Sequence, residues 1–376
     1  MDSKESPKTM KSNAMTSAER IEAALLGQNL DRLPFSPFLA YVWEHFPPAV
    51  QARGQMAFQH DIGADPLWRG APCPVTVVHD SSVSRLIRDL PQGREEIITT
   101  PVGSLTLRWE RTAQAANTLF LVEHPVRNVE DLKTLCYIEE HSSLNIDMTS
   151  WNRHVQKNPD GLHMPLLLPR CKSAFQSLVE HWVGTEQLAY LMVDHPQEFA
   201  ATWKVMAKND RQAAQLAADT GISRWWITWE DSSTQNYSPD IYRQFIAPEI
   251  AAWCSMLATR GQHYVQHACG HLRDLLPIMK TQGLAAVESL SPCPTGNLTL
   301  AQARNIMGPD LPIIGGIEPV TFLTTAEKDL EAYLHQVYAD NAGGRLVLAN
   351  SDSCPPGVTV EKFAIVAKVT RSLKIR

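Results

Sequence analysis

Two side chains that bind soft metal ions, the imidazole of His267 and the thiol of Cys269, lie two residues apart. The run 263–268 predicts a short strand, so both side chains should emerge on one face where that strand ends. Glu288 and Cys354 each follow a further apolar run. One nitrogen, two sulfurs and one oxygen form a ligand set that suits Zn²⁺.

The spacing of these residues supports their grouping. Between His267 and Glu288 there is room for one helix and one further strand, and the carboxyl ends of consecutive parallel strands are neighbours. A lone histidine or cysteine is, however, more often a packed or exposed residue than a metal ligand. Cys293, five residues after Glu288, and His271 in the loop after Cys269 are the alternative ligands. Neither directly ends a predicted strand.

Acidic side chains end another predicted strand, at 223–231. Glu230 and Asp231 could orient a ligand or relay a proton there. An equally good interpretation is that these residues mark the start of a capped helix and that their carboxylates are exposed to solvent. Gly315 and Gly316, late in a further strand, would let a ligand approach the backbone closely, and a tight turn explains them equally well.

An alternation of strands and helices must position these residues. Strands are predicted at 163–169, 223–231, 263–268, 284–287, 311–319 and 345–350, with helical segments between and after them. This order predicts an α/β fold, specifically a parallel (β/α)8 TIM barrel, whose active site forms at the carboxyl ends of the strands.

The amino-terminal half is less regular. A helix should begin at Thr16 or Ser17 and end at Gly27. Residues 1–15 are polar and predict a disordered lead-in, and we expect a single barrel domain over 16–376.

Apolar and polar residues alternate around Pro101 and Gly103 in the stretch 95–112, which predicts a small β-hairpin excursion from the barrel. Asn128 should cap a following helix, and Ser238 with Pro239 should begin a later one.

Composition restricts the class of protein. A chain of 376 residues with a net charge of −6 lacks the concentrated basic surface that binds nucleic acid. No apolar run approaches the about 18 residues of a membrane span. The first residues have no apolar signal segment. Seven scattered cysteines do not resemble a disulfide framework, so we expect a reducing cytoplasm.

Several segments resemble one known family. HACG around Cys269, VES around Glu288 and SDSCPPGV around Cys354 resemble the uroporphyrinogen decarboxylase superfamily, in its zinc-dependent, cobalamin-linked methyltransferase branch. The branch includes methylcobalamin:coenzyme M methyltransferases. ERIEAALLG followed by DRLP, far from these residues, resembles the opening of the same superfamily.

The resemblance implies a function and a ligand set. It implies His267, Cys269 and Cys354 as zinc ligands, and Glu288 as a weaker fourth that a substrate thiolate could displace. Gln235 lies in WEDSSTQ, a segment similar to one in the superfamily, and is expected with Gly316 to contact the cofactor. The implied reaction moves a methyl group from methylcobalamin to a small acceptor, such as coenzyme M, homocysteine or tetrahydrofolate. A cobalamin-binding Asp-x-His-x-x-Gly sequence is absent, so the cobalamin should be carried by a separate corrinoid protein.

Two alternative functions stay open. A uroporphyrinogen decarboxylase would need arginines near its amino terminus, and the segment FSPFLAYVWEHF at 35–46 contains none. A barrel with structural zinc could instead bind a corrinoid or tetrapyrrole without catalysis. Zinc ligands drawn from three strand ends favour catalysis, because structural zinc usually joins closely spaced ligand pairs.

Overall fold

The computed structural model describes residues 14–112 and 115–373. Most of the predicted lead-in, residues 1–13, lies outside this range. Met15 is already held by contacts: its backbone nitrogen donates to Asp31 Oδ2 at 3.2 Å, and Arg20 Nη2 donates to its carbonyl oxygen at 2.6 Å.

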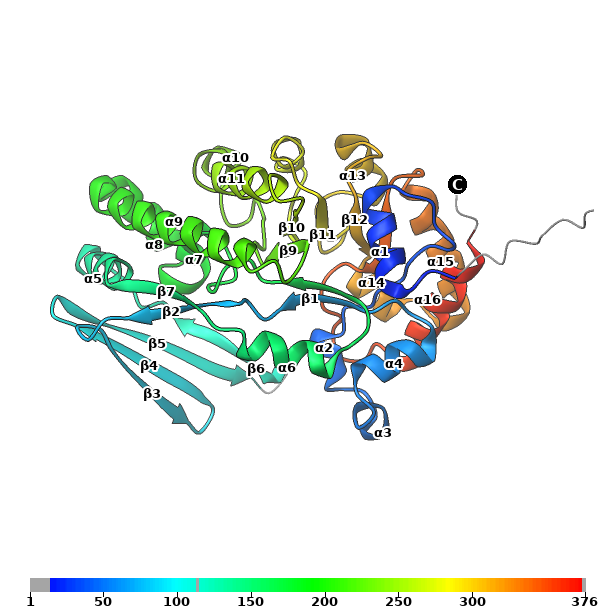
Figure 1. Cartoon of the computed structure of the whole chain (residues 1–376), viewed down its shortest axis with the longest axis horizontal. Coiled ribbons are helices and arrows are strands. Elements are labelled where there is room, and N and C mark those ends of the chain that lie inside the picture. The colour runs from blue at the N-terminus through cyan, green and yellow to red at the C-terminus, as the bar shows by residue number, and fades with distance from the viewer. Residues whose placement is uncertain (1–13, 113–114, 374–376) are drawn as a thin grey trace, which may run out of the picture.

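A parallel five-stranded sheet is built from the second half of the chain. Its strands are β9 (Trp225–Thr228), β10 (His263–His267), β11 (Ala286–Leu290), β12 (Ile313–Ile317) and β13 (Leu346–Asn350), and they lie side by side in chain order. Figure 1 shows β9 to β12 next to one another, with α10 (Pro239–Ile241), α11 (Ala247–Ala258) and α13 (Leu300–Met307) along one side. The predicted α/β fold is therefore confirmed, and each of these strands falls on or overlaps a predicted one.

Further parallel pairs extend the sheet at both edges. β1 (Leu67–Ala71) pairs with β8 (Leu162–Pro165), and the residue after β8, Leu166, forms an isolated bridge to Ile227 of β9. At the other edge Phe35 bridges to Leu348 of β13. The carbonyl oxygen of Phe35 accepts a hydrogen bond of 2.7 Å from the backbone nitrogen of Asp65, two residues before β1. Backbone contacts thus link both edges of the sheet to β1 and its approach.

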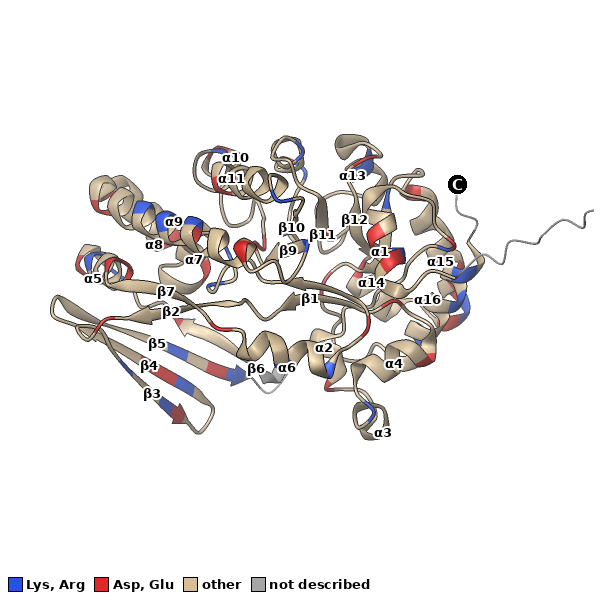
Figure 2. Cartoon of the chain, in the orientation of Figure 1, with Lys and Arg blue, Asp and Glu red and all other residues tan. Residues whose placement is uncertain are grey.

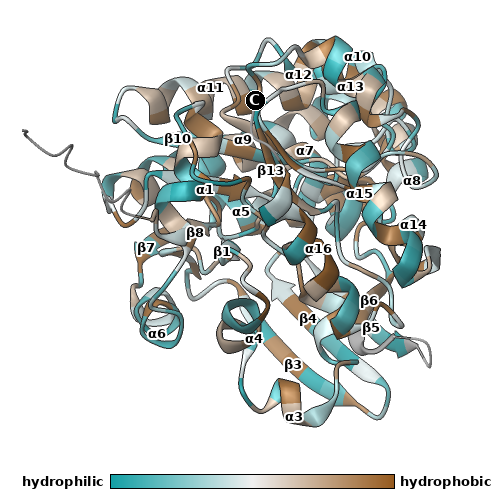
Figure 3. Ribbon diagram, turned by 90° about the vertical axis from the view of Figure 1, so that its right-hand side faces the viewer, coloured by the Kyte–Doolittle hydropathy of each residue, from teal (hydrophilic) through white to brown (hydrophobic). Residues whose placement is uncertain are grey.

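Successive residues of the parallel strands enter two different apolar clusters. In β13, Val347 and Ala349 pack with α1 (Ser17–Leu26), whereas Leu346 and Leu348 pack in the larger cluster that includes the outer helices. This is the period of two expected for a strand that is buried on both faces. Figure 3 shows β13 as an apolar strand inside the molecule.

Several helices are capped at the residues that the sequence predicts. The side chain of Thr16 accepts from the backbone nitrogen of Glu19 at the start of α1, and Gly27 ends that helix in a left-handed conformation with φ 67°. Asn128 caps α5 (Val129–Glu140), and Ser238 caps α10 (Pro239–Ile241).

The other helices mostly cover the strands. They are α2 (Ala40–Trp43), α3 (Pro48–Gln51), α4 (Gln55–Ile62), α6 (Thr149–Lys157), α7 (Ala174–Ser177), α8 (Thr185–Asp194), α9 (Pro196–Asp219), α11 (Ala247–Ala258), α12 (Leu276–Met279), α13 (Leu300–Met307), α14 (Pro319–Thr324), α15 (Glu327–Asp340) and α16 (Val360–Ser372), with π-helical turns at Leu178–Trp182 and Tyr242–Ile246. Within the described ranges, none of the helices combines the length and the apolar character that crossing a membrane would require.

The predicted hairpin is part of a larger antiparallel sheet. Its strands are β3 (Ser84–Leu90), β4 (Gly93–Thr100), β5 (Gly103–Thr112) and β6 (Ala115–Glu123), and a separate antiparallel pair joins β2 (Val75–His79) to β7 (Ser142–Ile146). The sheet projects to one side of the parallel strands in Figure 1, and Figure 2 shows charges of both signs along β3 to β5. Ile98 and Leu107 are nevertheless buried, so the sheet has an apolar inner face.

Candidate metal centre

The end of β10 supplies the imidazole and the thiol. His267 is the last residue of the strand and is buried, and Cys269 follows in the loop. In the parallel register His267 is level with Glu288 of β11, and the backbone nitrogen of Ala268 donates to the carbonyl oxygen of Glu288 at 2.9 Å. The prediction that these strand ends are neighbours is confirmed.

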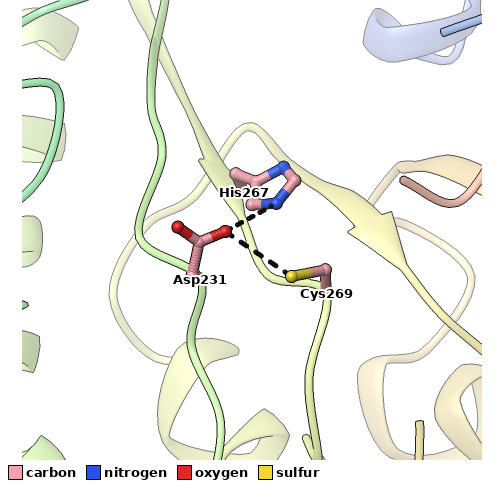
Figure 4. Close-up of side chains that lie close together, drawn as sticks. All are labelled: Asp231, His267 and Cys269. Carbon is pink, nitrogen blue, oxygen red and sulfur yellow. Dashed lines mark hydrogen bonds and ion pairs between the residues drawn. The ribbon is translucent and has the colours of Figure 1, made fainter. Parts of the chain in front are cut away.

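Asp231 brings a carboxylate to the same place from the neighbouring strand end. It lies three residues after β9 in a left-handed backbone conformation, φ 43°. Its Oδ1 is 3.1 Å from His267 Nε2 and accepts a hydrogen bond of 3.5 Å from Cys269 Sγ. The three ligand atoms all lie within 4.8 Å of one another, and Figure 4 shows the three side chains converging. A non-glycine residue with positive φ at a polar cluster is a common sign of a functional constraint.

The far side of the His267 ring is held by Glu288. His267 Nδ1 hydrogen-bonds to Glu288 Oε2, which leaves Nε2 directed at Asp231. Glu288 Oε1 in turn accepts from Arg69 Nη1 at 2.6 Å and from Ser289 Oγ at 2.9 Å. A carboxylate on the second ring nitrogen fixes the tautomer and orientation of a metal-binding histidine.

Lys172 and Glu180 complete the polar network. Lys172 Nζ donates to Asp231 Oδ2 at 2.9 Å and also contacts Glu180 Oε2. One oxygen of Asp231 is therefore neutralised by a buried ammonium group, while the other faces His267 and Cys269.

These neighbours shift the acidities of the cluster. Burial raises the pKa of the Cys269 thiol to about 11, although His267 opposes the shift. Burial opposes ionisation of His267, but the nearby charges of Glu288 and Cys269 raise its pKa well above the usual value. Burial also works against the Asp231 carboxylate, and the contacts with His267 and Lys172 nevertheless hold its pKa well below the usual range.

Aromatic rings wall one side of the cluster. Trp229 meets the His267 ring edge-on with centroids 5.0 Å apart, and Phe38 stacks on Trp229 at 6.0 Å. Gly70 allows this packing, because a Cβ at this residue would lie 2.2 Å from Trp229 Cζ2. The indole therefore limits how far the imidazole can rotate.

The four predicted ligands do not all meet. His267 and Cys269 come together, whereas Glu288 binds the opposite ring nitrogen of His267. Cys354, in the loop after β13, is buried, and its pKa is raised by burial and by the charges of Asp352 and Glu318. The carboxylate that faces His267 Nε2 and Cys269 Sγ is that of Asp231, whereas the sequence predicts that Glu288 provides the oxygen of the ligand set.

The other predicted site residues lie outside the cluster. Glu230 is fully buried and accepts hydrogen bonds from Ser173 N at 2.8 Å, Ser173 Oγ at 2.7 Å and Thr228 Oγ1 at 2.8 Å. Its carboxylate thus joins the end of β9 to the start of α7.

Gln235 is exposed, and its backbone nitrogen donates to Ser233 Oγ at 3.2 Å. Gly316 is buried in β12 with φ 101°, and a Cβ there would lie 3.3 Å from Val337 Cγ1 of α15. This glycine therefore faces a covering helix. Among the described residues, the rivals Cys293, which is exposed, and His271 do not join the three-residue group.

Sequence reasoning missed Arg69 and Lys172. Arg69 lies in β1, and an arginine in a buried strand needs a buried partner. Recognition of LWRGA as a strand would therefore have indicated a buried acidic partner for this arginine. Lys172 lies in a loop whose path brings it to Asp231, and no local sequence pattern indicates that path.

The donor set fits a zinc ion. Nitrogen, sulfur and carboxylate oxygen are the atoms that Zn²⁺ binds in proteins, and a set of three protein ligands leaves a fourth position open, as in catalytic zinc sites. The bond from Glu288 to His267 supplies the outer contact that such histidines usually have.

Comparison with known proteins gives one family match and fold similarity. A family model described as uroporphyrinogen decarboxylase (URO-D) matches residues 122–373. No curated protein matches the sequence. The structure is similar to a methyltransferase from Methanosarcina mazei, with a TM-score of 0.57 and 12% identity over 95% of this chain and 99% of that one. A protein described as a vitamin-B12-independent methionine synthase from Listeria monocytogenes aligns with a TM-score of 0.38 and 9% identity, over 91% of this chain and 96% of that one.

Proposed function

The chain belongs to the uroporphyrinogen decarboxylase family, and from that premise we propose that it is a zinc-dependent methyltransferase. It moves a methyl group from a methylated corrinoid, carried on a separate protein, to a small acceptor. The acceptor is a thiol such as coenzyme M or homocysteine, or else tetrahydrofolate. The observation that carries the proposal is the convergence of Asp231, His267 and Cys269 at the ends of two adjacent parallel strands.

The residues of the chain have separate tasks in this proposal. His267 Nε2, Cys269 Sγ and Asp231 Oδ1 hold the metal ion. Zinc, when bound, supplies a position at which a thiol loses its proton near neutral pH, where a free thiol is mostly protonated. Glu288 fixes the ring of His267, and Lys172 holds Asp231 through its second oxygen.

Arg69 keeps Glu288 ionised and in place. Its guanidinium donates to Glu288 Oε1 and also to the carbonyl oxygen of Ser36 at 2.8 Å, so its orientation is fixed from two sides. Burial opposes the ionisation of Glu288, but His267 and Arg69 hold its pKa below the usual value. The ionised carboxylate therefore accepts a hydrogen bond from Nδ1–H of His267 at neutral pH.

Cys354 stays a candidate fourth ligand. Like the other ligands it follows a parallel strand, β13, and belongs to the same end of the sheet. Burial and the charge of Asp352 raise the pKa of both Cys354 and Cys269, but the group of ligand atoms that lie close together consists of Asp231, His267 and Cys269, so these three residues are the primary site.

We also propose the finer architecture. The bridges from Leu166 to β9 and from Phe35 to β13 support a closed (β/α)8 barrel, with α1 covering the amino-terminal end of its interior. Residues 16–376 would form this one domain, and the scattered cysteines support a cytoplasmic location.

The test is to load the purified protein with Zn²⁺ and supply free methylcobalamin together with coenzyme M, homocysteine or tetrahydrofolate. Loss of the methylcobalamin absorption band and formation of the methylated acceptor report transfer. X-ray absorption at the zinc edge should gain one sulfur scatterer when the correct thiol is added.

Chelation separates the alternatives. A methyltransferase should lose transfer but keep its circular dichroism spectrum, whereas a structural zinc site should unfold. A decarboxylase should consume uroporphyrinogen with or without zinc. Absence of transfer to every acceptor, together with decarboxylation after chelation, would refute the proposal.

A further inference from the structure

A carboxylate from a third strand end lies within electrostatic reach of the metal cluster. Asp352 follows β13 by two residues, and its charge interacts with the thiol of Cys269 and with the imidazole of His267. Burial raises the pKa of Cys269 to about 11, and the charge of Asp352 adds to that shift. Asp352 is therefore a charged neighbour of the ligand atoms, although it is not one of the three residues that converge.

The loop that carries Asp352 is fixed by the last residue of β13. Asn350 is 1% exposed, and its Nδ2 donates to the carbonyl oxygen of Asp352 at 2.7 Å and to that of Phe38 at 2.8 Å. Asp352 has a positive φ of 110°, and its Oδ1 accepts from the backbone nitrogen of Ser353 at 2.7 Å. A non-glycine residue keeps such a conformation only where surrounding contacts enforce it. These bonds therefore hold the carboxylate in one place beside the cluster.

Both cations of the centre are already paired with carboxylates. Arg69 binds Glu288, and Lys172 lies between Asp231 and Glu180. Burial raises the pKa of Glu180 to about 7, so this carboxylate is mostly ionised at pH 8. Neither cation is therefore left over for an anionic ligand.

A bound zinc ion would not leave a positive surplus. Its two charges equal those of the Cys269 thiolate and of the one carboxylate, Asp231 or Glu180, that Lys172 does not neutralise. The charge of Asp352 comes in addition, and among the described residues this carboxylate forms no ion pair; its side chain accepts from the Ser353 backbone. The metal centre thus carries a surplus negative charge before an acceptor binds.

Charges farther from the cluster do not cancel that of Asp352. Around Cys354, Glu318 and Lys362 add one charge of each sign. Toward solvent, burial raises the pKa of Tyr41, and the charge of Asp352 adds to that shift. Tyr41 is 55% exposed, so the negative potential extends to a side chain that solvent reaches.

We infer that the acceptor is a thiol whose tail carries a positive charge, such as a substituted ammonium group, and that Asp352 selects it. This inference rests on the proposed function, because the sulfur of the acceptor takes the open position of the metal. The bound sulfur has lost its proton and adds a negative charge near that of Asp352. A cationic tail offsets this charge, whereas a sulfonate adds to it. Coenzyme M, which carries a sulfonate, is therefore the least suited of the proposed thiols.

Thiols that share a two-carbon chain test this selection. Thiocholine is cationic, 2-mercaptoethanol is neutral and coenzyme M is anionic, and the methylated nitrogen of thiocholine cannot bind the metal. Each is titrated at pH 8 into the full-length protein loaded with Co²⁺ in place of Zn²⁺, and the absorption band of the cobalt–thiolate bond reports binding. We expect thiocholine to bind about tenfold more tightly than 2-mercaptoethanol, and coenzyme M about tenfold more weakly.

A charge-removing variant assigns the selection to Asp352. Asp352→Asn keeps an oxygen that can accept from Ser353, and asparagine tolerates positive φ. The preference for thiocholine over coenzyme M should fall about tenfold, and differences in thiol acidity cancel because the same thiols are compared. The matched control is Asp310→Asn, which removes the same charge at an 87% exposed residue before β12, at the opposite end of the strands, and should keep the preference.

Ionic strength provides a second measurement that needs no variant. Raising NaCl from about 20 mM to about 500 mM should weaken the preference of the unmodified protein, because salt screens the charge of Asp352. This measurement decides alone if Asp352→Asn does not fold. A preference that is the same in Asp352→Asn, or that salt leaves unchanged, would overturn the inference and leave the proposed function standing. Failure of every thiol to bind the metal would refute both.

Discussion

Two buried charge networks of this protein, one around His267 and one around Arg170, contain the same kinds of side chain but differ in which atoms are left without an internal partner. In the metal cluster, Glu288 and Lys172 occupy the outer atoms of His267 and Asp231, so that the inner nitrogen and oxygen converge with a thiol. In the second network, Glu139 and Asp210 bind the guanidinium of Arg170, and Asp210 Oδ2 is buried without a hydrogen-bond partner among the described residues. The first arrangement leaves ligand atoms that suit a cation, whereas the second pairs its own cation internally. What a network binds is decided by which of its atoms have no internal partner.

Removing a proposed ligand should produce the largest effect. Cys269→Ala deletes the sulfur of the cluster, and we expect zinc affinity to fall more than 100-fold and methyl transfer to be lost with it. Competition with a chromogenic chelator measures the affinity. Cys293→Ala, at an exposed cysteine, is the matched control and should bind zinc normally. Normal zinc binding by Cys269→Ala would remove this residue from the ligand set.

Removing an outer contact should have an intermediate effect. Glu288→Gln keeps the shape of the side chain but loses the charge that holds His267 Nδ1. We expect zinc affinity to fall by about 10- to 100-fold, as for other outer contacts of metal-binding histidines. The same chelator competition reports it. A loss as large as that of Cys269→Ala would instead indicate that Glu288 binds the metal directly.

The network of Arg170 with Glu139 and Asp210 should make the free energy of unfolding depend on pH. Because the pKa of Asp210 rises from 3.8 to about 7 on folding, mainly through burial, the folded state holds a proton that the unfolded state has released between these values. The unfolding free energy from this group is therefore greatest below pH 4 and falls as the pH rises through 7. Relative to Asp210→Asn, the unmodified protein should lose on the order of 1 kcal/mol between pH 5 and pH 8, measured by urea unfolding. Parallel pH profiles for the two proteins would contradict this assignment.

Cys354→Ala should have the smallest effect on the metal. The thiol lies among Asn350, Asp352 and Glu318, so we expect less than a tenfold change in zinc affinity. A loss comparable to that of Cys269→Ala would establish Cys354 as the fourth ligand predicted from the sequence.

Much of the fold could be predicted because it depends on local patterns. The apolar runs that became β10 and β13, the cap at Thr16 and the stop at Gly27 are all readable within a few residues. The antiparallel sheet was predicted only as one hairpin. The strands β3 and β6 add to it through pairing partners that the sequence does not specify, and β3 is almost wholly exposed.

Some residues of the candidate site could likewise be predicted from local sequence, and others could not. His267 and Cys269 could be recognised because their grouping follows from two residues at one strand end. Asp231 and Glu230 are adjacent in sequence and could not be distinguished. The positive φ of Asp231 turns its carboxylate toward His267, whereas the carboxylate of Glu230 binds Ser173 and Thr228. Gly316 was assigned to the cofactor, and its conformation in β12 turns it toward α15.

The α/β alternation, the strand ends and the types of donor atom available there could be read from the sequence, since each depends on residues close together in the chain. The folded arrangement was needed to show that Asp231 meets His267 and Cys269, and that Glu288 holds the opposite side of the imidazole ring. The physical reason is that hydrogen-bond pairing among buried charges depends on distances between strands and helices far apart in the chain, and those distances are set by packing.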